Sequence, residues 1–320
     1  MYADAVIEGG GVKAIGLVGA IYEAEQRGYK WKKLAGTSAG AMIAALLAAG
    51  YSAEELKEEL MDLDYACFIE KKGLQKFLPL VGGAFNLWSK YGVFGGEYIE
   101  EWVREKLHAK GVVTFKDLKK PLYIIASDIS GEDMLVLPND ISRYGIDPAT
   151  LEVATAVRMS TSLPFFYRPV KLRYTENKQN MEHYIVDGGI LSNFPVWIFD
   201  TEKNHQWPTF GFRLVTENYG KPQQVKGIFS LGMALIGTMM EAHDERHIKE
   251  MDYLRTILVP TLGVKTTEFN ISQETRENLF QSGVNAATKF FTQWNFSQYI
   301  EQYHKKKRNP AVDVKSKKTP

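Results

Sequence analysis

The sequence predicts an α/β fold in which helices cover both faces of a central, mostly parallel β-sheet, in three α/β/α layers. Two short apolar runs within the first 50 residues each end at glycines, and each leads into a segment with helical periodicity. This order of strand, loop, helix, strand, turn and helix indicates a parallel sheet, because parallel neighbours need a crossover connection. Later apolar runs of strand length extend the predicted sheet, at Leu122 to Ala126, Met134 to Leu137, Tyr184 to Val186, Thr209 to Leu214 and Ile257 to Val259.

The chain opens with a predicted strand at Ala5 to Ile7, which stops at the glycine triplet Gly9 to Gly11. A helix is expected from Val12 to Arg27, because apolar residues recur there at helical spacing and Gly28 follows as a stop signal. The triplet therefore lies at a junction between a strand and a helix.

The second strand, Lys33 to Ala35, runs into the sequence Gly36-Thr37-Ser38-Ala39-Gly40. A helix of small residues is expected from Ala39 to Ala49, and Gly50 ends it. Ser52 to Glu55 has the pattern of a capping box, which predicts the start of another helix.

The composition is typical of a globular protein. Of the 320 residues, 45% are hydrophobic and 24% are charged, and the net charge of +1 gives no field that favours nucleic acid. The single cysteine, Cys67, excludes an internal disulfide. No secretory signal is visible, and no uncharged apolar run reaches the roughly 18–20 residues of a membrane span. We expect a cytoplasmic protein, or one bound peripherally at a membrane, with one domain over residues 1–303 and a basic, disordered tail over 304–320.

The sequence around Ser38 fits G-x-S-x-G, the pattern of a nucleophile elbow. In such an elbow the serine lies on a sharp strand-to-helix turn, and the two glycines allow the strand and the helix to approach closely. The helix that follows directs its first backbone N–H groups, including that of Ala39, toward the serine. A chance match is the alternative, and the flanking strand and helix favour Ser38 as a nucleophile.

The triplet Gly9-Gly10-Gly11 is a candidate source of backbone N–H donors for an oxyanion. Lys13 adds a positive charge nearby. A dinucleotide-binding loop is disfavoured, because Ala14 replaces the last glycine of G-x-G-x-x-G and no acidic residue ends a second strand about 20 residues on. A tight turn without a catalytic role remains the alternative.

A serine nucleophile needs a base, and no histidine lies in a strong turn motif. The six histidines are His108, His183, His205, His243, His247 and His304. The i, i+4 spacing of His243 and His247 would suit a metal pair, but the charges around them favour a solvated helix face. Asp187 stands out instead, because it ends an apolar strand and precedes two glycines. At the carboxyl end of a strand in a parallel sheet it would lie beside a serine from a neighbouring strand, although Asp-Gly is also a common turn.

Together these segments resemble the patatin-like phospholipase family. The glycine-rich segment EGGGVKAIGLVGAI and the elbow GTSAG are followed, in the family's order, by SDISGEDMLVL, MSTSLPFFYRPV and VDGGILSNFPV. The resemblance covers about Ala5 to Val215. Ala14 stands where a glycine is usual and Glu8 stands where some members carry aspartate, and neither departure changes a proposed catalytic atom.

The resemblance implies a serine–aspartate dyad that uses no histidine, with Ser38 as the nucleophile and Asp187 as the base. The backbone near the serine and the glycine triplet would form the oxyanion hole. The expected residues of this hole are Gly9, Gly10, Gly11, Lys13 and Ala39. No metal and no cofactor is expected, since no cluster of acidic residues has the spacing of a calcium loop.

Two apolar stretches are candidate walls for a trough that holds an acyl chain. Gly73 to Gly96 is rich in glycine and poor in acids, and Val225 to Ala242 is a Met-rich helix candidate. The wall residues expected from them are Phe85, Leu87, Trp88, Leu231, Met233 and Leu235. Ordinary core packing is the alternative for both stretches.

The predicted function is a lipid acyl hydrolase of phospholipase A or lysophospholipase type, which works through an acyl-enzyme. The expected partners are a phospholipid or other acyl ester and a membrane or micelle surface, and not nucleic acid. The basic run Lys305 to Arg308 could attract anionic lipid, with a solubilising tail as the alternative. Three other functions stay open: a carboxylesterase or thioesterase, an acyltransferase, and a lipid-surface protein with an inactive site. Head group, sn-1 or sn-2 preference and oligomeric state are not predicted.

Overall fold

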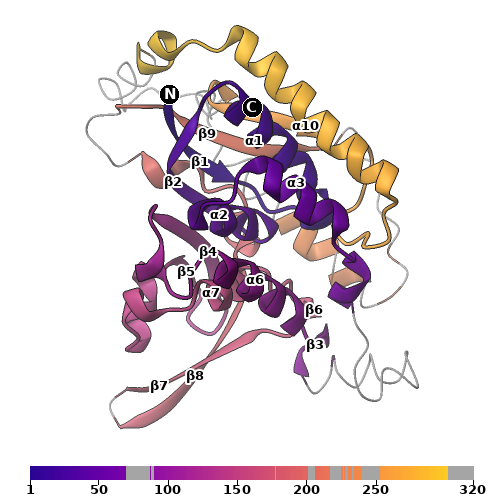
Figure 1. The fold of residues 1–320 in the computed structure, drawn as a ribbon. Coiled ribbons are helices and arrows are strands. Elements are labelled where there is room, and N and C mark those ends of the chain that lie inside the picture. Colours follow the sequence, from indigo (N-terminus) through magenta and orange to yellow (C-terminus); the bar gives the residue numbers. More distant parts are fainter. Residues whose placement is uncertain are drawn as a thin grey trace, which may run out of the picture.

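The computed structural model describes residues 1–69, 87, 90–176, 178–200, 206–216, 225, 227, 230–232, 234–239 and 253–301. Within these ranges an eight-stranded sheet has the order β10-β9-β1-β2-β4-β8-β7, and β5 also pairs with β4. Five of the strands run parallel: β1 (Tyr2–Ile7), β2 (Lys30–Thr37), β4 (Leu122–Asp128), β9 (Thr209–Val215) and β10 (Thr256–Pro260). The predicted α/β fold with a mainly parallel central sheet is confirmed (Figure 1).

The other strands of this sheet run antiparallel to β4 or to each other. They are β5 (Asp133–Leu137), β7 (Val170–Glu176) and β8 (Gln179–Asp187). The β7–β8 hairpin extends beyond the rest of the sheet in Figure 1. β3 (Gly92–Phe94) and β6 (Phe165–Tyr167) form a separate two-stranded parallel sheet. Every apolar run predicted as a strand lies within one of these strands, with longer bounds.

Local signals place several helix ends, while the segment predicted as a helix from Val12 to Arg27 begins as a 3-10 helix at residues 11–13 and is α-helical only from Ala14 to Gln26. Gly50 has φ 107° and ends α2, a left-handed conformation that glycine adopts readily. The Glu55 backbone N–H donates to Ser52 Oγ (3.2 Å) and the Ser52 N–H donates to Glu55 Oε2 (2.7 Å), which is the predicted capping box. The α-helices are α1 (Ala14–Gln26), α2 (Ala39–Ala49), α3 (Ala53–Asp62), α6 (Glu97–Ala109), α7 (Val153–Ser160) and α10 (Gln273–Gln293). The 3-10 helices are η1 (Gly11–Lys13), η2 (Tyr65–Ile69), η3 (Phe115–Asp117), η4 (Asn139–Tyr144), η5 (Pro148–Thr150), η6 (Gly188–Ile190) and η7 (Val196–Phe199).

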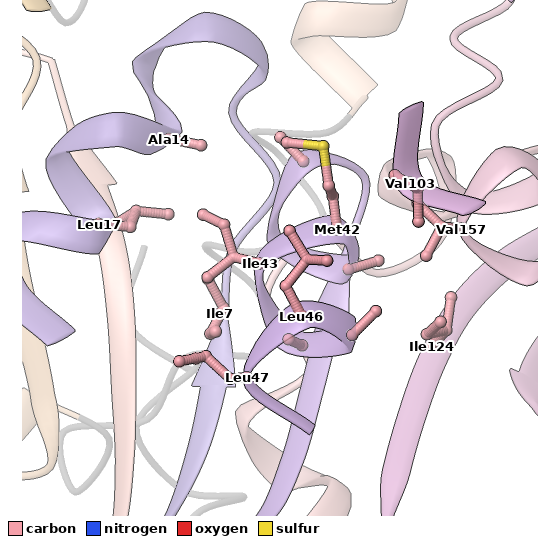
Figure 2. Packing of buried hydrophobic residues seen from close by; sticks show 14 of the residues in the cluster. Ile7, Ala14, Leu17, Met42, Ile43, Leu46, Leu47, Val103, Ile124 and Val157 are labelled. Atoms are coloured by element: carbon pink, nitrogen blue, oxygen red, sulfur yellow. The ribbon is translucent and has the colours of Figure 1, made fainter. Parts of the chain in front are cut away.

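Alternate side chains of β1 enter two different cores, because successive residues of a strand face opposite sides of a sheet. Ile7 lies in the large core, and Figure 2 shows Ile43 and Leu47 of α2 beside it. Val6 lies in a smaller cluster on the other face, with Phe194 and the residues of η7. Helices α1 and α2 therefore cover one face of the parallel strands, while η7 covers part of the other.

Several predictions concern segments that are described only in part. Most of Gly73 to Gly96 and the whole tail, 304–320, lie outside the described residues. In the predicted helix Val225 to Ala242, residues 230–232 and 234–239 are helical. Across the described ranges, no helix combines the length and the apolar character needed to cross a bilayer. The division into one domain and a tail stays a prediction.

Candidate active site

Ser38 lies on a sharp turn between β2 and α2, and its backbone is in an unusual conformation (φ 54°, ψ −127°). A residue other than glycine rarely adopts a positive φ, so the surrounding structure must hold Ser38 in this conformation. A Cβ built on Gly36 would lie 2.4 Å from the Gly40 carbonyl oxygen, and one built on Gly40 would lie 2.3 Å from the Ile7 carbonyl oxygen. Both glycines are therefore required by the close approach of β2, α2 and β1.

Ser160, the last residue of α7, holds the backbone of Ser38. The Ser38 backbone N–H donates to Ser160 Oγ (2.8 Å), and Ser160 Oγ in turn donates to the Ile125 carbonyl oxygen (2.6 Å). Ser160 is fully buried, so no water replaces it as an acceptor at this position. Because the Ser38 N–H is already hydrogen-bonded to Ser160 Oγ, it is not available to bind an oxyanion.

The carboxylate of Asp187 accepts a hydrogen bond from the Ser38 hydroxyl, with 2.7 Å between Oγ and Oδ2. Its second oxygen accepts from the Gly189 backbone N–H (2.8 Å). The Asp187 backbone N–H donates to the Ser162 carbonyl oxygen (3.0 Å), which ties the residue to the loop after α7. The side chain is 1% exposed, and this burial raises its pKa from 3.8 to about 6 although the two hydrogen bonds oppose the shift.

Asp187 reaches Ser38 by a different route from the one predicted. β8 runs antiparallel to β4, and β4 lies between β8 and β2, so Asp187 does not come from a parallel strand beside the serine. The chain crosses β4 directly after the aspartate, and a Cβ on Gly188 would lie 2.2 Å from the Ile125 carbonyl oxygen. It then reaches β2, where Thr37 Oγ1 donates to the Ser192 carbonyl oxygen (3.0 Å). Gly188 thus serves a close crossing rather than the edge of a parallel sheet.

The glycine triplet meets the same site from β1. Gly10 and Gly11 line the pocket that contains Ser38, Ala39 and Asp187. No hydrogen bond within the described part of the chain uses the backbone N–H of Gly10, Gly11 or Ala39. The three N–H groups that were predicted as oxyanion donors are therefore not engaged by other groups of the described chain.

The other two residues of the predicted hole are placed differently. The Gly9 N–H donates to the Asn193 carbonyl oxygen (3.2 Å), so this donor is already used. Lys13 is half-buried in η1 and is not among the residues that line the pocket. Gly11 has φ 55°, and a Cβ on it would lie 2.1 Å from the Thr266 carbonyl oxygen, so this position requires glycine.

The pocket beside Ser38 and Asp187 is almost entirely apolar and is open to solvent, and its empty space amounts to about 740 Å³ when the solvent at its mouth is counted. Its walls come from η1, α1, α2, α3, η2, α6, the segment 161–167 that ends in β6, and the loop at residues 266–269. The main wall residues are Met42, Leu60, Phe68, Ile99, Phe166 and Phe269. Phe269 lies against both neighbouring rings, with centroids 5.5 Å from Phe166 and 6.1 Å from Phe68, which gives the pocket a continuous aromatic side.

The wall residues expected from the sequence do not line this pocket within the described ranges. Leu87 is half-buried, and Leu231 and Leu235 are exposed on the helical segment after residue 230. Phe85, Trp88 and Met233 lie outside the described residues. The expectation missed the actual wall because those side chains come from segments with ordinary core-like patterns.

His183 belongs to a separate polar cluster. Its Nδ1 lies 2.6 Å from Asp128 Oδ2, and its Nε2 lies 3.1 Å from the Tyr174 hydroxyl. His108 is near the end of α6, and the other four histidines lie outside the described residues. Among the described residues, no three His, Cys, Asp or Glu side chains gather as metal ligands would.

Comparison with known proteins assigns the family. Residues 5–200 match the family described as patatin-like phospholipase. The chain belongs to the patatin-like phospholipase family. Family membership supports lipid acyl hydrolase activity for this chain.

Individual relatives agree with the family assignment. The uncharacterized protein YqhO of Bacillus subtilis (strain 168) is 38% identical over 299 residues, which covers 92% of this chain and 100% of YqhO. The probable lipid hydrolase 463L of invertebrate iridescent virus 6 is 26% identical over 202 residues, 61% of this chain and 62% of that protein. The solved structure of VipD from Legionella pneumophila is similar in fold, with a TM-score of 0.54 at 16% identity, and the match covers 90% of this chain and 66% of VipD.

In this patatin-like protein, the sequence does not reveal the part played by the end of α7 and the residues that follow it. Met159 to Val170 was recognised as a family segment, but no role was attached to Ser160 or Ser162. Nothing in the local pattern indicates that Ser160 Oγ meets a backbone N–H 122 residues earlier. The signal that marks Ser160 as important is its complete burial at a helix end. The sequence does not show this burial, because it arises only when the chain folds.

Proposed function

We propose that this protein hydrolyses carboxylic esters of lipids with Ser38 as the nucleophile and Asp187 as the base. The observation that carries the proposal is the 2.7 Å hydrogen bond between Ser38 Oγ and Asp187 Oδ2, at the wall of an apolar pocket. The unused N–H groups of Gly10 and Gly11 support it, since acyl transfer needs donors for a developing oxyanion.

The reaction begins with proton transfer from Ser38 Oγ to Asp187 as the serine oxygen attacks the ester carbonyl. The raised pKa of about 6 makes Asp187 a stronger base than an ordinary aspartate, while it remains ionised at neutral pH. The oxyanion of the tetrahedral intermediate accepts hydrogen bonds from Gly10 and Gly11, and the N–H of Ala39 is a third donor. Asp187 then gives the proton to the leaving alcohol, which leaves an acyl group on Ser38.

Water completes the cycle. Asp187 takes a proton from a water molecule, whose oxygen attacks the acyl carbonyl, and the same donors hold the second oxyanion. The Ser38–acyl bond breaks, a fatty acid forms, and the proton on Asp187 returns to Ser38 Oγ. Each half-reaction uses one proton acceptor and one set of backbone donors, so no histidine and no metal takes part in these steps.

We infer that the substrate is a phospholipid or a lysophospholipid. The pocket walls carry aromatic and aliphatic side chains, which suits the burial of one acyl chain. The name of the viral relative, a probable lipid hydrolase, points to the same substrate class. Such a substrate is presented at a membrane or micelle surface, where we place the protein during its reaction.

The test is product analysis by mass spectrometry after incubation with vesicles of mixed phospholipids. We expect free fatty acid and lysophospholipid from the intact protein and neither product from Ser38→Ala. A fluorophosphonate probe should label Ser38 in the intact protein. A protein that cleaves p-nitrophenyl esters but gains nothing from vesicles or micelles would instead be a soluble esterase, and acylated alcohols among the products would identify an acyltransferase.

His183→Gln is the matched control for the dyad, because it alters the histidine closest in sequence to Asp187. We expect its rate to stay within about threefold of the parent, since His183 faces Asp128 rather than Ser38. A folded His183→Gln protein that is as inactive as Ser38→Ala would replace the dyad with a histidine-based mechanism.

A further inference from the structure

Large apolar side chains are exposed together next to the pocket walls. Five of them are each 44–57% exposed, which is unusual for neighbouring residues of this size. We name them the outer apolar surface, and they are Tyr91, Phe165, Leu231, Leu235 and Met239.

Phe165 connects the two parts of this surface. It pairs with Gly92 across the small β3–β6 sheet, which places Tyr91 next to it. On its other side, Gly232 packs so closely on the Phe165 ring that a Cβ on the glycine would lie 2.9 Å away. The contacts of one phenylalanine therefore join the β3–β6 sheet to the helical segment after residue 230.

The helical segment is apolar on two sides. Gly232 and Ile236 face inward, and Ile236 belongs to the main core. Leu231, Leu235 and Met239 are spaced by four residues and are all exposed, so they form one stripe on the outside of the segment. Within the described part of the chain, the core accounts for the inward face of this segment and not for the outward apolar stripe.

The two exposed aromatic residues also have strained backbones. Tyr91 has φ 60° and Phe165 has φ 66°, values that a residue with a side chain adopts at a cost of about 1 kcal/mol or more. Each ring is partly exposed and also packs on a neighbour, the Tyr91 ring on Tyr184 with centroids 5.5 Å apart and the Phe165 ring on Gly232. The fold therefore holds both partly exposed rings in fixed positions.

The outer apolar surface borders the pocket. Leu163, Phe166 and Tyr167 line the pocket, and Phe165 lies between them in the chain. The short segment that ends in β6 thus places side chains in the pocket lining and leaves the Phe165 ring partly exposed. The outer apolar surface is therefore continuous along the chain with one wall of the pocket.

We propose that the outer apolar surface seats the protein on a phospholipid bilayer. The inference rests on the proposed function, because a lipid that leaves a bilayer for the pocket is transferred most favourably across a surface that excludes water. Tyr91 and Phe165 enter the interfacial region, where aromatic rings are favoured, and the leucine and methionine stripe enters the acyl boundary.

The experiment measures flotation of the full-length Ser38→Ala protein with phosphatidylcholine vesicles, so that no hydrolysis alters the lipid. The Leu235→Glu/Met239→Glu variant should lower the partition coefficient at least about tenfold. It removes two exposed apolar side chains that would be buried in the bilayer, and it adds two charges. The matched control is Leu258→Glu/Leu262→Glu, which changes two exposed apolar residues of β10 and the loop after it and should stay within about twofold.

A second measurement uses the protein with Ser38 intact. Leu235→Glu/Met239→Glu should cleave a soluble p-nitrophenyl ester at the parent rate and vesicle lipid at least about tenfold more slowly. Equal flotation of the two double variants would overturn the proposal. A parent protein that sediments as a dimer, and that only Leu235→Glu/Met239→Glu dissociates, would also overturn it by giving the surface to a second copy. Flotation is read without catalysis, so an inactive dyad would refute the proposed function and leave this result standing.

Discussion

Asp187 and Asp128 are two buried carboxylates on the same face of the sheet with opposite surroundings. Asp187 pairs with Ala126 across β8 and β4, and Asp128 lies two residues further along β4, on the same side of that strand. Within the described part of the chain, Asp187 accepts two hydrogen bonds, from Ser38 Oγ and the Gly189 N–H. Its pKa rises to about 6 because these bonds do not offset its burial.

The Asp128 carboxylate has twice as many hydrogen-bond partners as the Asp187 carboxylate. Four polar groups lie within hydrogen-bond distance of its two oxygens: the Tyr144 hydroxyl, His183 Nδ1 and the backbone N–H groups of Ser130 and Gly131. Burial alone would raise the pKa of Asp128, but these hydrogen bonds outweigh burial and hold the pKa below its usual value. The comparison teaches that the balance between burial and hydrogen-bond donors separates the two carboxylates: burial prevails at Asp187, which has two donors, and hydrogen bonds prevail at Asp128, which has four.

The largest expected difference is in activity. Asp187→Asn should lower kcat for ester hydrolysis by about 10³-fold or more, because the base is lost. Asp128→Asn should leave kcat within about tenfold, since its partners lie around His183 and not around Ser38. Steady-state kinetics on a soluble ester, with circular dichroism to verify folding, would compare the two. Equal losses in two folded variants would remove the distinction between the carboxylates.

The two substitutions should change stability in opposite directions. An ionised Asp187 with a pKa of about 6 costs the folded state about 3 kcal/mol at pH 8, and asparagine avoids that cost. Because the folded pKa is raised, this group's stability is present below about pH 4 and is lost as the pH rises through 6. The advantage of Asp187→Asn should therefore be absent at pH 4, grow between pH 4 and pH 6 and be complete above pH 6.

Asp128→Asn should lower the free energy of unfolding by about 2–4 kcal/mol at neutral pH, since it leaves buried donors without acceptors. Urea denaturation at pH 4 and pH 8 measures both variants. A less stable Asp187→Asn protein at pH 8 would contradict the assignment of Asp187 as a costly ionised group.

A smaller effect is expected at Ser160, which acts on the dyad through the Ser38 backbone. Ser160→Ala removes the acceptor of the Ser38 N–H and should lower kcat about 10- to 100-fold with KM within about twofold, because the strained turn loses its support. Ser162→Ala is the matched control, since the carbonyl oxygen that holds Asp187 is kept. Its kcat should fall less. Rescue by Ser160→Thr would support the hydrogen bond as the cause, and an unchanged kcat in Ser160→Ala would contradict it.

The smallest difference between the parent and the Asp128 variant is expected in the position of the pH profile. The rate of hydrolysis should rise about tenfold per pH unit up to a pKa of about 6 and then reach a plateau, because the ionised form of Asp187 is the base. Asp128→Asn should keep the same inflection, which a profile of kcat/KM against pH would reveal. An inflection that moves in His183→Gln but not in Asp128→Asn would point to a histidine as the base.

Most of the fold and the turn at Ser38 could be predicted from the sequence because both depend on short-range signals. The apolar runs, Gly50 and the Ser52 capping box act on neighbours within a few residues, so their effects are visible in the order of residues. The pocket walls were not predictable in this way. Phe68, Phe166 and Phe269 have core-like patterns in three distant segments, and only packing makes them one wall.

By itself, the sequence determined the turn at Ser38, because Gly36 and Gly40 act within five residues on a strand and a helix that are continuous with them. Tertiary structure decided which groups meet that serine. Three features depend on contacts between residues that lie far apart in the chain. They are the approach of Asp187 across β4, the hydrogen bond from the Ser38 N–H to Ser160 Oγ, and the aromatic wall of the pocket. Such contacts depend on strand order and direction, which short-range patterns do not encode.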